Sequence, residues 1–186
     1  MATFFNNNQI LAVDLIPCSA IKLNIGGALI PLSQVFHHDE FIAKKLITVA
    51  YKDGNKYRSL SDNRIVNNYD ALLDDNTQRT HLILDCDDCN FKSSPEISVS
   101  GTLYTNKLEY SLPRISPEQM PEQTEQLNAI KQGAFHLLIQ LYSCEKAYTM
   151  VLCPEATAYQ ATVQEQISST DVSITIKNLT AHQYLM

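Results

Sequence analysis

Positive charge is scarce in this sequence. The 14 Lys and Arg residues stand against 20 Asp and Glu residues, which gives a net charge of −6. The longest basic cluster is the pair Lys44-Lys45. A nucleic-acid-binding protein needs a positive stripe that displaces the counterions of the phosphate backbone. The sequence therefore argues against direct binding of DNA or RNA.

Long hydrophobic runs and a leader signal are also missing. No stretch approaches the roughly 18 consecutive apolar residues of a membrane-spanning helix. The first apolar stretch has no Lys or Arg before it, and Asp14 interrupts it, whereas a secretory signal needs a basic start and an unbroken apolar segment. We therefore predict a cytoplasmic protein that is not secreted by a signal peptide. Its five cysteines should be reduced there, and an odd number fits poorly with a disulfide framework.

Glycine is rare, and so are the motifs that carry catalysis. The chain has five glycines, and the pair Gly26-Gly27 lacks the Lys and Ser or Thr that complete a phosphate-binding loop. No G-x-S-x-G elbow is present, and no cysteine lies in a recognisable nucleophile context. The sequence therefore predicts no catalytic residues and no cofactor, which favours a protein that is not an enzyme.

The motif most typical of a site is Cys86-Asp87-Asp88-Cys89. A structural zinc ion needs four ligands, and the sequence offers no second close pair, since Cys144 and Cys153 could join only through the fold. The two acidic residues inside the motif oppose formation of thiolates. His136 is expected on the side of a helix opposite its core stripe. We therefore predict no metal site and interpret Cys86 as a small core residue, while zinc held by Cys86 and Cys89 with Cys144 or Cys153 is the alternative.

Alternating apolar and polar residues predict strands over most of the chain. Two hairpins are expected, one over 46–60 with its turn at Asp53-Gly54, and one over 96–112 with its turn around Thr105-Asn106. Short helical segments are expected over 39–45 and 64–75. The other expected strands are one that ends at Pro17, then 21–25, a segment that ends at Pro31, 80–86, 146–153 and 171–177.

One long amphipathic helix is predicted over about 121–143. Pro121 suits a first helical turn, and Glu122 and Glu125 suit the positive end of the helix dipole. Apolar residues then recur at spacings of three and four, which is the helical period. The stripe is wide enough to expect a sheet on one side and a loop or another subunit on its flank. Its members are Leu127, Ile130, Ala134, Phe135, Leu137, Leu138, Ile139, Leu141 and Tyr142.

The strands and the helix together predict an α+β, mainly β fold. Because hairpins pair their strands in opposite directions, we expect an antiparallel β-barrel or sandwich with the helix packed on it. Residues 1–186 form a single domain in this interpretation, since the length suits one domain.

The favoured function is a non-enzymatic structural or assembly subunit, or an adaptor. It would act through protein partners or self-association in a larger complex of viral, phage-tail or secretion type. Three features motivate this hypothesis: charged residues are 18% of the chain, below about 25% in typical domains, the helix stripe is wide, and catalytic motifs are missing. The alternatives are a small cytoplasmic enzyme or ligand-binding barrel whose site forms only in three dimensions, and a zinc-stabilised interaction domain.

Overall fold

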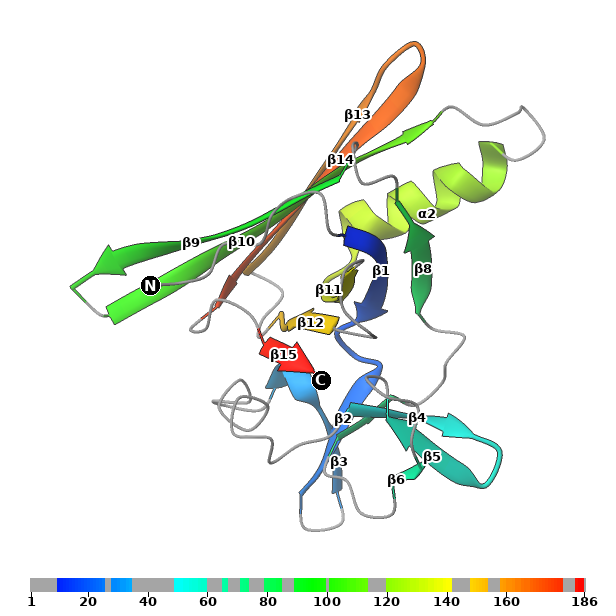
Figure 1. Ribbon diagram of the computed structural model, residues 1–186, viewed down its shortest axis with the longest axis vertical. Coiled ribbons are helices and arrows are strands. Elements are labelled where there is room, and N and C mark those ends of the chain that lie inside the picture. Colours follow the sequence, from blue (N-terminus) through cyan, green and yellow to red (C-terminus); the bar gives the residue numbers. More distant parts are fainter. Residues whose placement is uncertain are drawn as a thin grey trace.

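A computed structural model gives the structure of part of the chain, and all that follows concerns those residues. Among the described residues the fold is mostly β, with one α-helix and sheets that are antiparallel but for one short pairing (Figure 1). This confirms the predicted mainly β composition. The described residues form three open sheets and no closed barrel. They are residues 10–25, 28–34, 49–59, 65–66, 71–73, 79–84, 89–99, 101–113, 120–141, 148–153, 158–178 and 183–185.

Sheet A lies at the centre of the described structure. Its five strands follow the order β15 (Gln183–Leu185), β12 (Tyr148–Val151), β11 (Phe135–Leu141), β1 (Ile10–Pro17) and β8 (Thr80–Ile83). β1 and β11 are antiparallel neighbours, with Leu15 opposite Leu137 and Ile16 opposite His136. All four of these residues are buried, although the two pairs lie on opposite faces. Both faces of the β1–β11 pair are therefore covered.

Sheet C contains the two longest hairpins of the described structure. Its strands follow the order β13 (Tyr159–Glu165), β14 (Ser169–Asn178), β10 (Gly101–Pro113) and β9 (Cys89–Ser98). The predicted turn at Thr105-Asn106 is wrong, because both residues lie inside β10. The chain reverses between Ser98 and Gly101, and Gly101 has a φ of 128° that favours glycine. Asn106 resembles a turn residue in the sequence but is a buried strand residue.

Sheet B consists of six short strands. Their order is β3 (Ala28–Pro31), β2 (Ile21–Ile25), β7 (Ala71–Leu73), β4 (Val49–Asp53), β5 (Lys56–Ser59) and β6 (Ile65–Val66), and the 3-10 helix η2 (Leu32–Gln34) follows β3. The predicted hairpin at Asp53-Gly54 is confirmed, since Asp53 pairs with Lys56 and Gly54 has a φ of 59°. β4 and β7 pair in parallel.

Two expected helical segments have different outcomes. The helix expected within 64–75 is wrong, because Ile65–Val66 and Ala71–Leu73 are strands that pair into sheet B. These short strands are held by neighbouring strands, so their pairing overrides the weak local helical pattern. The helical turns expected over 39–45 lie outside the described residues.

The long predicted helix is correct only in its first half. Helix α2 (Met120–Gln132) buries Leu127 and Ile130, and the chain then becomes strand β11. In the sequence Phe-His-Leu-Leu-Ile-Gln-Leu of β11, one face is apolar, and the other carries Leu138 between His136 and Gln140. A continuous apolar run contains the helical period as well as the strand period, so periodicity alone cannot separate them. Of the stripe expected on the helix, Phe135, Leu137, Leu138 and Ile139 are buried strand residues of sheet A, while Leu127 and Ile130 are on α2.

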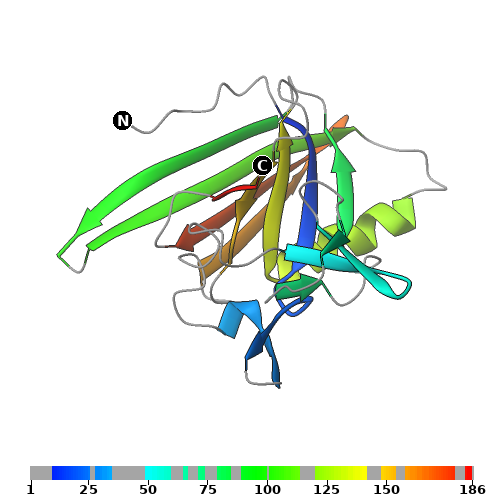
Figure 2. The same ribbon diagram turned by 60° about the horizontal axis from the view of Figure 1, so that its bottom comes forward.

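Sheets A and C and α2 contribute to one hydrophobic cluster. Figure 2 shows the strands of sheet C passing beside β1 and β11, with α2 near one end. The cluster includes Val13, Leu15, Leu137, Ile139 and Val151 from sheet A, Phe91, Leu108, Tyr110, Val172, Ile174 and Ile176 from sheet C, and Leu127 and Ile130 from α2.

Replacing Gly133 tests where α2 ends. A Cβ atom at Gly133 would lie 2.7 Å from Cε2 of Phe135 and 2.9 Å from the carbonyl oxygen of Ala129. Because that carbonyl also accepts the Gly133 amide, we expect Gly133→Ala to lower the free energy of unfolding by about 1–3 kcal/mol. A glycine inside a continuous 121–143 helix would give the opposite sign, a gain of about 1 kcal/mol. Urea unfolding measures the difference, with the exposed Asn128→Ala in α2 as the control.

Candidate functional site

The cysteines singled out in the sequence are only partly described. Cys89 is the first residue of β9, where it is buried opposite Tyr110 and joins the hydrophobic cluster. Cys86 and Cys144 lie outside the described residues, so the core position of Cys86 stays a prediction. In the described ranges no group of three or more His, Cys, Asp or Glu side chains could hold a metal ion.

A cysteine pair that sequence analysis missed lies beside sheet A. Cys18 follows β1, and its backbone N–H donates to the carbonyl of Ala134 at 3.0 Å. Its thiol donates to the carbonyl oxygen of Cys153, with 3.7 Å between sulfur and oxygen. Cys153 is fully buried. The contact between Cys18 and Cys153 joins residues 135 positions apart, and no local pattern in the sequence indicates it.

The surroundings of Cys18 make its thiol a poor nucleophile and a poor metal ligand. A hydrogen bond with the Cys153 side chain raises the pKa of Cys18 most, and burial and the negative charge of an ionised Cys153 raise it further. The thiolate is the form that attacks electrophiles and binds metals. Cys18 therefore remains protonated at neutral pH, where it acts as a packing and hydrogen-bonding group.

His136 has a different environment from the one predicted. The sequence placed it on the exposed side of a helix, but it lies on β11 with no exposed surface. The backbone N–H of Cys153 donates to Nδ1 of His136 at 2.8 Å. A neutral imidazole that accepts at Nδ1 carries its proton at Nε2. The histidine thus fixes the chain just after β12, and the expectation was wrong because β11 was taken for helix.

Two buried asparagines hold the same segment from sheet C. The Asn106 amide donates to Oδ1 of Asn178 at 2.7 Å, and the Asn178 amide donates to the carbonyl of Leu152 at 2.6 Å. Both asparagines are almost completely buried. Buried polar groups are stable when they are hydrogen-bonded, and such bonds restrict how the layers can pack. Residues 152 and 153 are therefore an anchor between sheets A and C.

A second polar cluster lies between β1 and β8. Asp14 sits directly opposite His81, and its Oδ1 contacts Nδ1 of the imidazole. Arg79 donates from Nη1 to Oδ2 of Asp14 at 3.1 Å. Asp14 is 8% exposed, whereas the His81 side chain is 52% exposed. The signal in the sequence was Asp14 itself, an acidic residue inside an apolar run.

The Asp14–His81 contact resembles the pair that orients a catalytic histidine. Catalysis of that kind also needs a nucleophile in hydrogen-bond reach of the imidazole. Within the described ranges no Ser, Thr or Cys side chain is bonded to His81. The arrangement that is present can join the edge strand β8 to β1 and can neutralise a buried carboxylate with Arg79.

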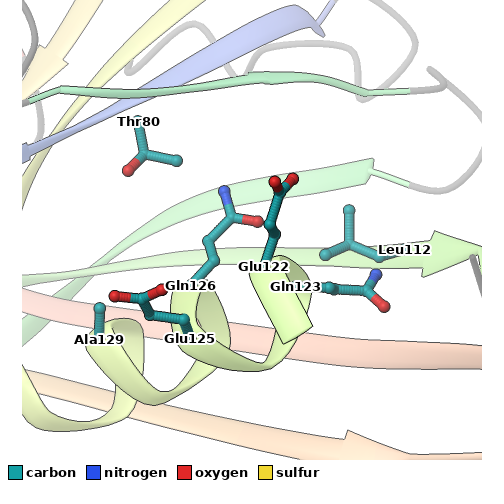
Figure 3. A pocket seen from close by; sticks show the side chains of 7 residues that line it. All are labelled: Thr80, Leu112, Glu122, Gln123, Glu125, Gln126 and Ala129. Atoms are coloured by element: carbon teal, nitrogen blue, oxygen red, sulfur yellow. The ribbon is translucent and has the colours of Figure 1, made fainter. Parts of the chain in front are cut away.

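The hollow beside α2 is open. It measures about 570 Å³ and lies between the first turns of the helix, Thr80 at β8 and Leu112 on β10. Glu122 and Gln126 extend from the helix into this space (Figure 3). The lining is Thr80, Leu112, Glu122, Gln123, Glu125, Gln126 and Ala129. Because both glutamates are exposed, the hollow presents solvated carboxylates and amides without a buried titratable group.

The end of the β9–β10 hairpin projects from the rest of the protein (Figures 1 and 2). We call residues 94–99 and 101–104 the arm. Ile97 is 87% exposed, Leu103 is 37% exposed, and Val99 in the turn is fully exposed. Exposed aliphatic side chains therefore lie on both faces of the arm, because Ile97 pairs with Thr102 whereas Leu103 pairs with Glu96.

Polar contacts fix the arm where it leaves sheet C. Thr105 donates to a carboxylate oxygen of Glu96 at 2.7 Å, and Nζ of Lys177 lies 3.1 Å from the other oxygen. The hydrogen bond from Thr105 and the nearby Lys177 ammonium lower the pKa of Glu96. The arm is thus tied to β14 on its outer face while its tip carries exposed aliphatic groups.

Comparisons with protein-family models, curated proteins and solved structures find no match to this chain. In the described residues no helix is long and apolar enough to cross a membrane.

The raised pKa of Cys18 predicts a loss of stability at alkaline pH. The unfolded chain releases the thiol proton near pH 8.5–9, whereas the folded protein retains it, so this stabilisation is complete below that range and declines above it. One such group lowers the free energy of unfolding by at most about 1.4 kcal/mol per pH unit. Cys18→Ser should flatten the decline between about pH 8.5 and 10.

Urea unfolding over that pH range measures the slope. The range stops near pH 10 because burial also raises the pKa values of Tyr110 and Tyr159, which add declines of the same sign at higher pH. The exposed neighbour Ser19 supplies the control, Ser19→Ala. An unchanged slope in Cys18→Ser would show that the thiol is not held protonated.

A double-mutant cycle tests the Asp14–Arg79 pair. Because the side chains are 10% and 27% exposed, we expect Asp14→Asn and Arg79→Met to be coupled by about 1–2 kcal/mol in unfolding free energy. The cycle cancels the other interactions of Arg79. The same cycle on Lys107 and Glu109, which are 44% and 41% exposed, should give under about 0.5 kcal/mol. Equal couplings would contradict the buried position of Asp14.

Proposed function

We propose that the protein is a non-enzymatic interaction module that binds a protein partner through the arm. In this proposal the chain is a single domain, sheets A and C form a sandwich, and the module belongs to a larger assembly. The observation that carries the proposal is the exposure of Ile97, Val99 and Leu103 at the end of one hairpin, with Ile97 and Leu103 on its two faces. Scattered apolar residues are ordinary on a protein surface, but a partner that grips the end of the hairpin from both sides would bury all three of these side chains.

The arm is suited to binding because it is both apolar and held in place. Burying aliphatic surface contributes about 25 cal/mol per Å², so removing three exposed side chains from water is favourable. The contacts of Glu96 with Thr105 and Lys177 fix the base of the arm before any partner arrives. A pre-organised hairpin loses less conformational entropy on binding than a flexible loop does.

The structural evidence for an interaction module differs from the evidence that the sequence analysis used. The wide apolar stripe of the predicted helix no longer supports a partner, since residues 135–139 are buried inside sheet A. The support now comes from Ile97, Val99 and Leu103, which lie within the hairpin predicted over 96–112. The low content of charged residues and the low reactivity of the Cys18 thiol agree with a binding role.

Removing the apolar tip tests the proposal. The triple variant Ile97→Ser, Val99→Ser and Leu103→Ser should keep its stability, because the three side chains are exposed, and should lose at least about tenfold in partner affinity through lost apolar burial. Affinity capture from the source cells identifies proteins retained by the wild type, and calorimetry with the purified partner measures affinity.

The matched control is Ile83→Ser. Ile83 is 78% exposed on β8, so the same substitution is made at similar exposure away from the arm. This variant should bind as the wild type does. Equal affinity of the wild type and the triple variant for every captured protein would refute the proposal.

A further inference from the structure

β13 forms the edge of sheet C opposite to the arm. It pairs with β14 from Tyr159, opposite Ile176, to Glu165, opposite Thr170, and no described strand pairs with its other side. Proteins protect such edges with Pro, Lys or short strands. β9 at the other edge contains Lys92 and Pro95, whereas the seven residues of β13 contain neither Lys nor Pro.

The hydrogen-bond pattern shows which backbone groups of β13 face outward. The N–H of Gln166 donates to the carbonyl of Ser169 at 2.8 Å, so these two residues form a hydrogen-bonded pair. Bonded and non-bonded pairs alternate along an antiparallel ladder. The residues whose backbone N–H and C=O point away from β14 are therefore Tyr159, Ala161, Val163 and Glu165.

These residues also present a partly uncovered apolar face. Ala161 and Val163 lie opposite Ile174 and Val172, on the inner face of sheet C, and pack against the hydrophobic cluster. Both are only half-buried. A further strand beside β13 would satisfy the outward backbone groups and would cover these two side chains at the same time.

We propose that β13 pairs antiparallel with β13 of a second copy of this chain, across a twofold axis at Thr162. The strand sequence Tyr-Gln-Ala-Thr-Val-Gln-Glu is self-complementary in this register. Ala161 meets the second copy's Val163 on the inner face, and Thr162 meets its own counterpart on the outer face, a pairing that favours cross-strand contact. No two like charges face each other.

Opposite charges on Glu165 and Lys131 also favour this pairing of two copies. A hollow of about 360 Å³ lies between the end of α2 and the start of β13, and Lys131, Gly133 and Tyr159 are among its lining residues. Pairing about Thr162 brings the second copy's Glu165 opposite Tyr159, beside this hollow, where its carboxylate meets the Lys131 ammonium. Glu165 and Lys131 have no ion-pair partner in the described part of their own chain.

The mass of the protein in solution and charge complementation at Thr162 test this proposal. Multi-angle light scattering should give twice the chain mass of 20.9 kDa. Thr162→Lys and Thr162→Glu should each weaken dimerisation at least about tenfold, because like charges then face each other across the axis. An equimolar mixture of the two variants should restore the dimer. Thr175→Lys, on the same outer face but on β14, should remain dimeric.

A wild type that stays monomeric at every concentration overturns the proposal, as do Lys and Glu variants that dimerise like the wild type. A second variant set tests the register: Glu165→Lys should weaken the dimer, and the double variant Glu165→Lys with Lys131→Glu should restore it. A double variant that stays monomeric overturns the register.

The side chains of Thr162, Glu165 and Lys131 are exposed, so the variants should fold. The inference does not depend on the proposed function, because the arm is at the opposite edge of sheet C.

Discussion

The burial of both faces of the β1–β11 pair is the constraint around which the described structure is arranged. Leu15 and Leu137 face sheet C and α2, while Ile16 and His136 face the other way, and none is exposed. A strand pair covered on both sides is rich in apolar residues, and its buried polar residues, here Asp14 and His136, need hydrogen-bond partners. It also requires cover from elsewhere, and sheet C and α2 supply it on one face.

The same constraint explains what the sequence could and could not predict. Strands with one face in the core, such as β14 with Val172, Ile174 and Ile176, alternate clearly and were predicted correctly. The Asp53-Gly54 hairpin was predicted because its turn depends on local backbone geometry. β11 was mistaken for helix because its apolar residues also continue the spacing of three and four that begins at Leu127 and Ile130, and Leu138 interrupts the strand alternation. The strand β13 was not predicted at all, since its partly exposed residues give a weak pattern.

The polar sites could not be predicted because their members meet only in the fold. Asp14 and Arg79 are 65 positions apart, and Asn106 and Asn178 are 72 apart. The sequence does show that each residue is unusual among its neighbours: Asp14 is an acid within an apolar strand, and Asn106 is an amide within a strand. Such anomalies indicate that a buried partner exists, because an unpaired buried polar group is costly, but they do not identify it. Of the Cys86–Cys89 motif, the described residue Cys89 is the first residue of β9.

Sheet C connects the two proposed interactions, because each lies at one of its edges. A twofold dimer through β13 joins two copies of the sheet and leaves the two β9 edges, with their arms, at opposite ends. Such a dimer presents two identical arms on a fixed frame, so two partner sites within its span can be bound together. The second binding event is then intramolecular, and the overall affinity can exceed that of one arm by about 10²–10⁴ when the spacing matches. Pro95 and Lys92 on β9 are consistent with this arrangement, because they disfavour strand addition at that edge and leave the side chains of the arm to make the contact.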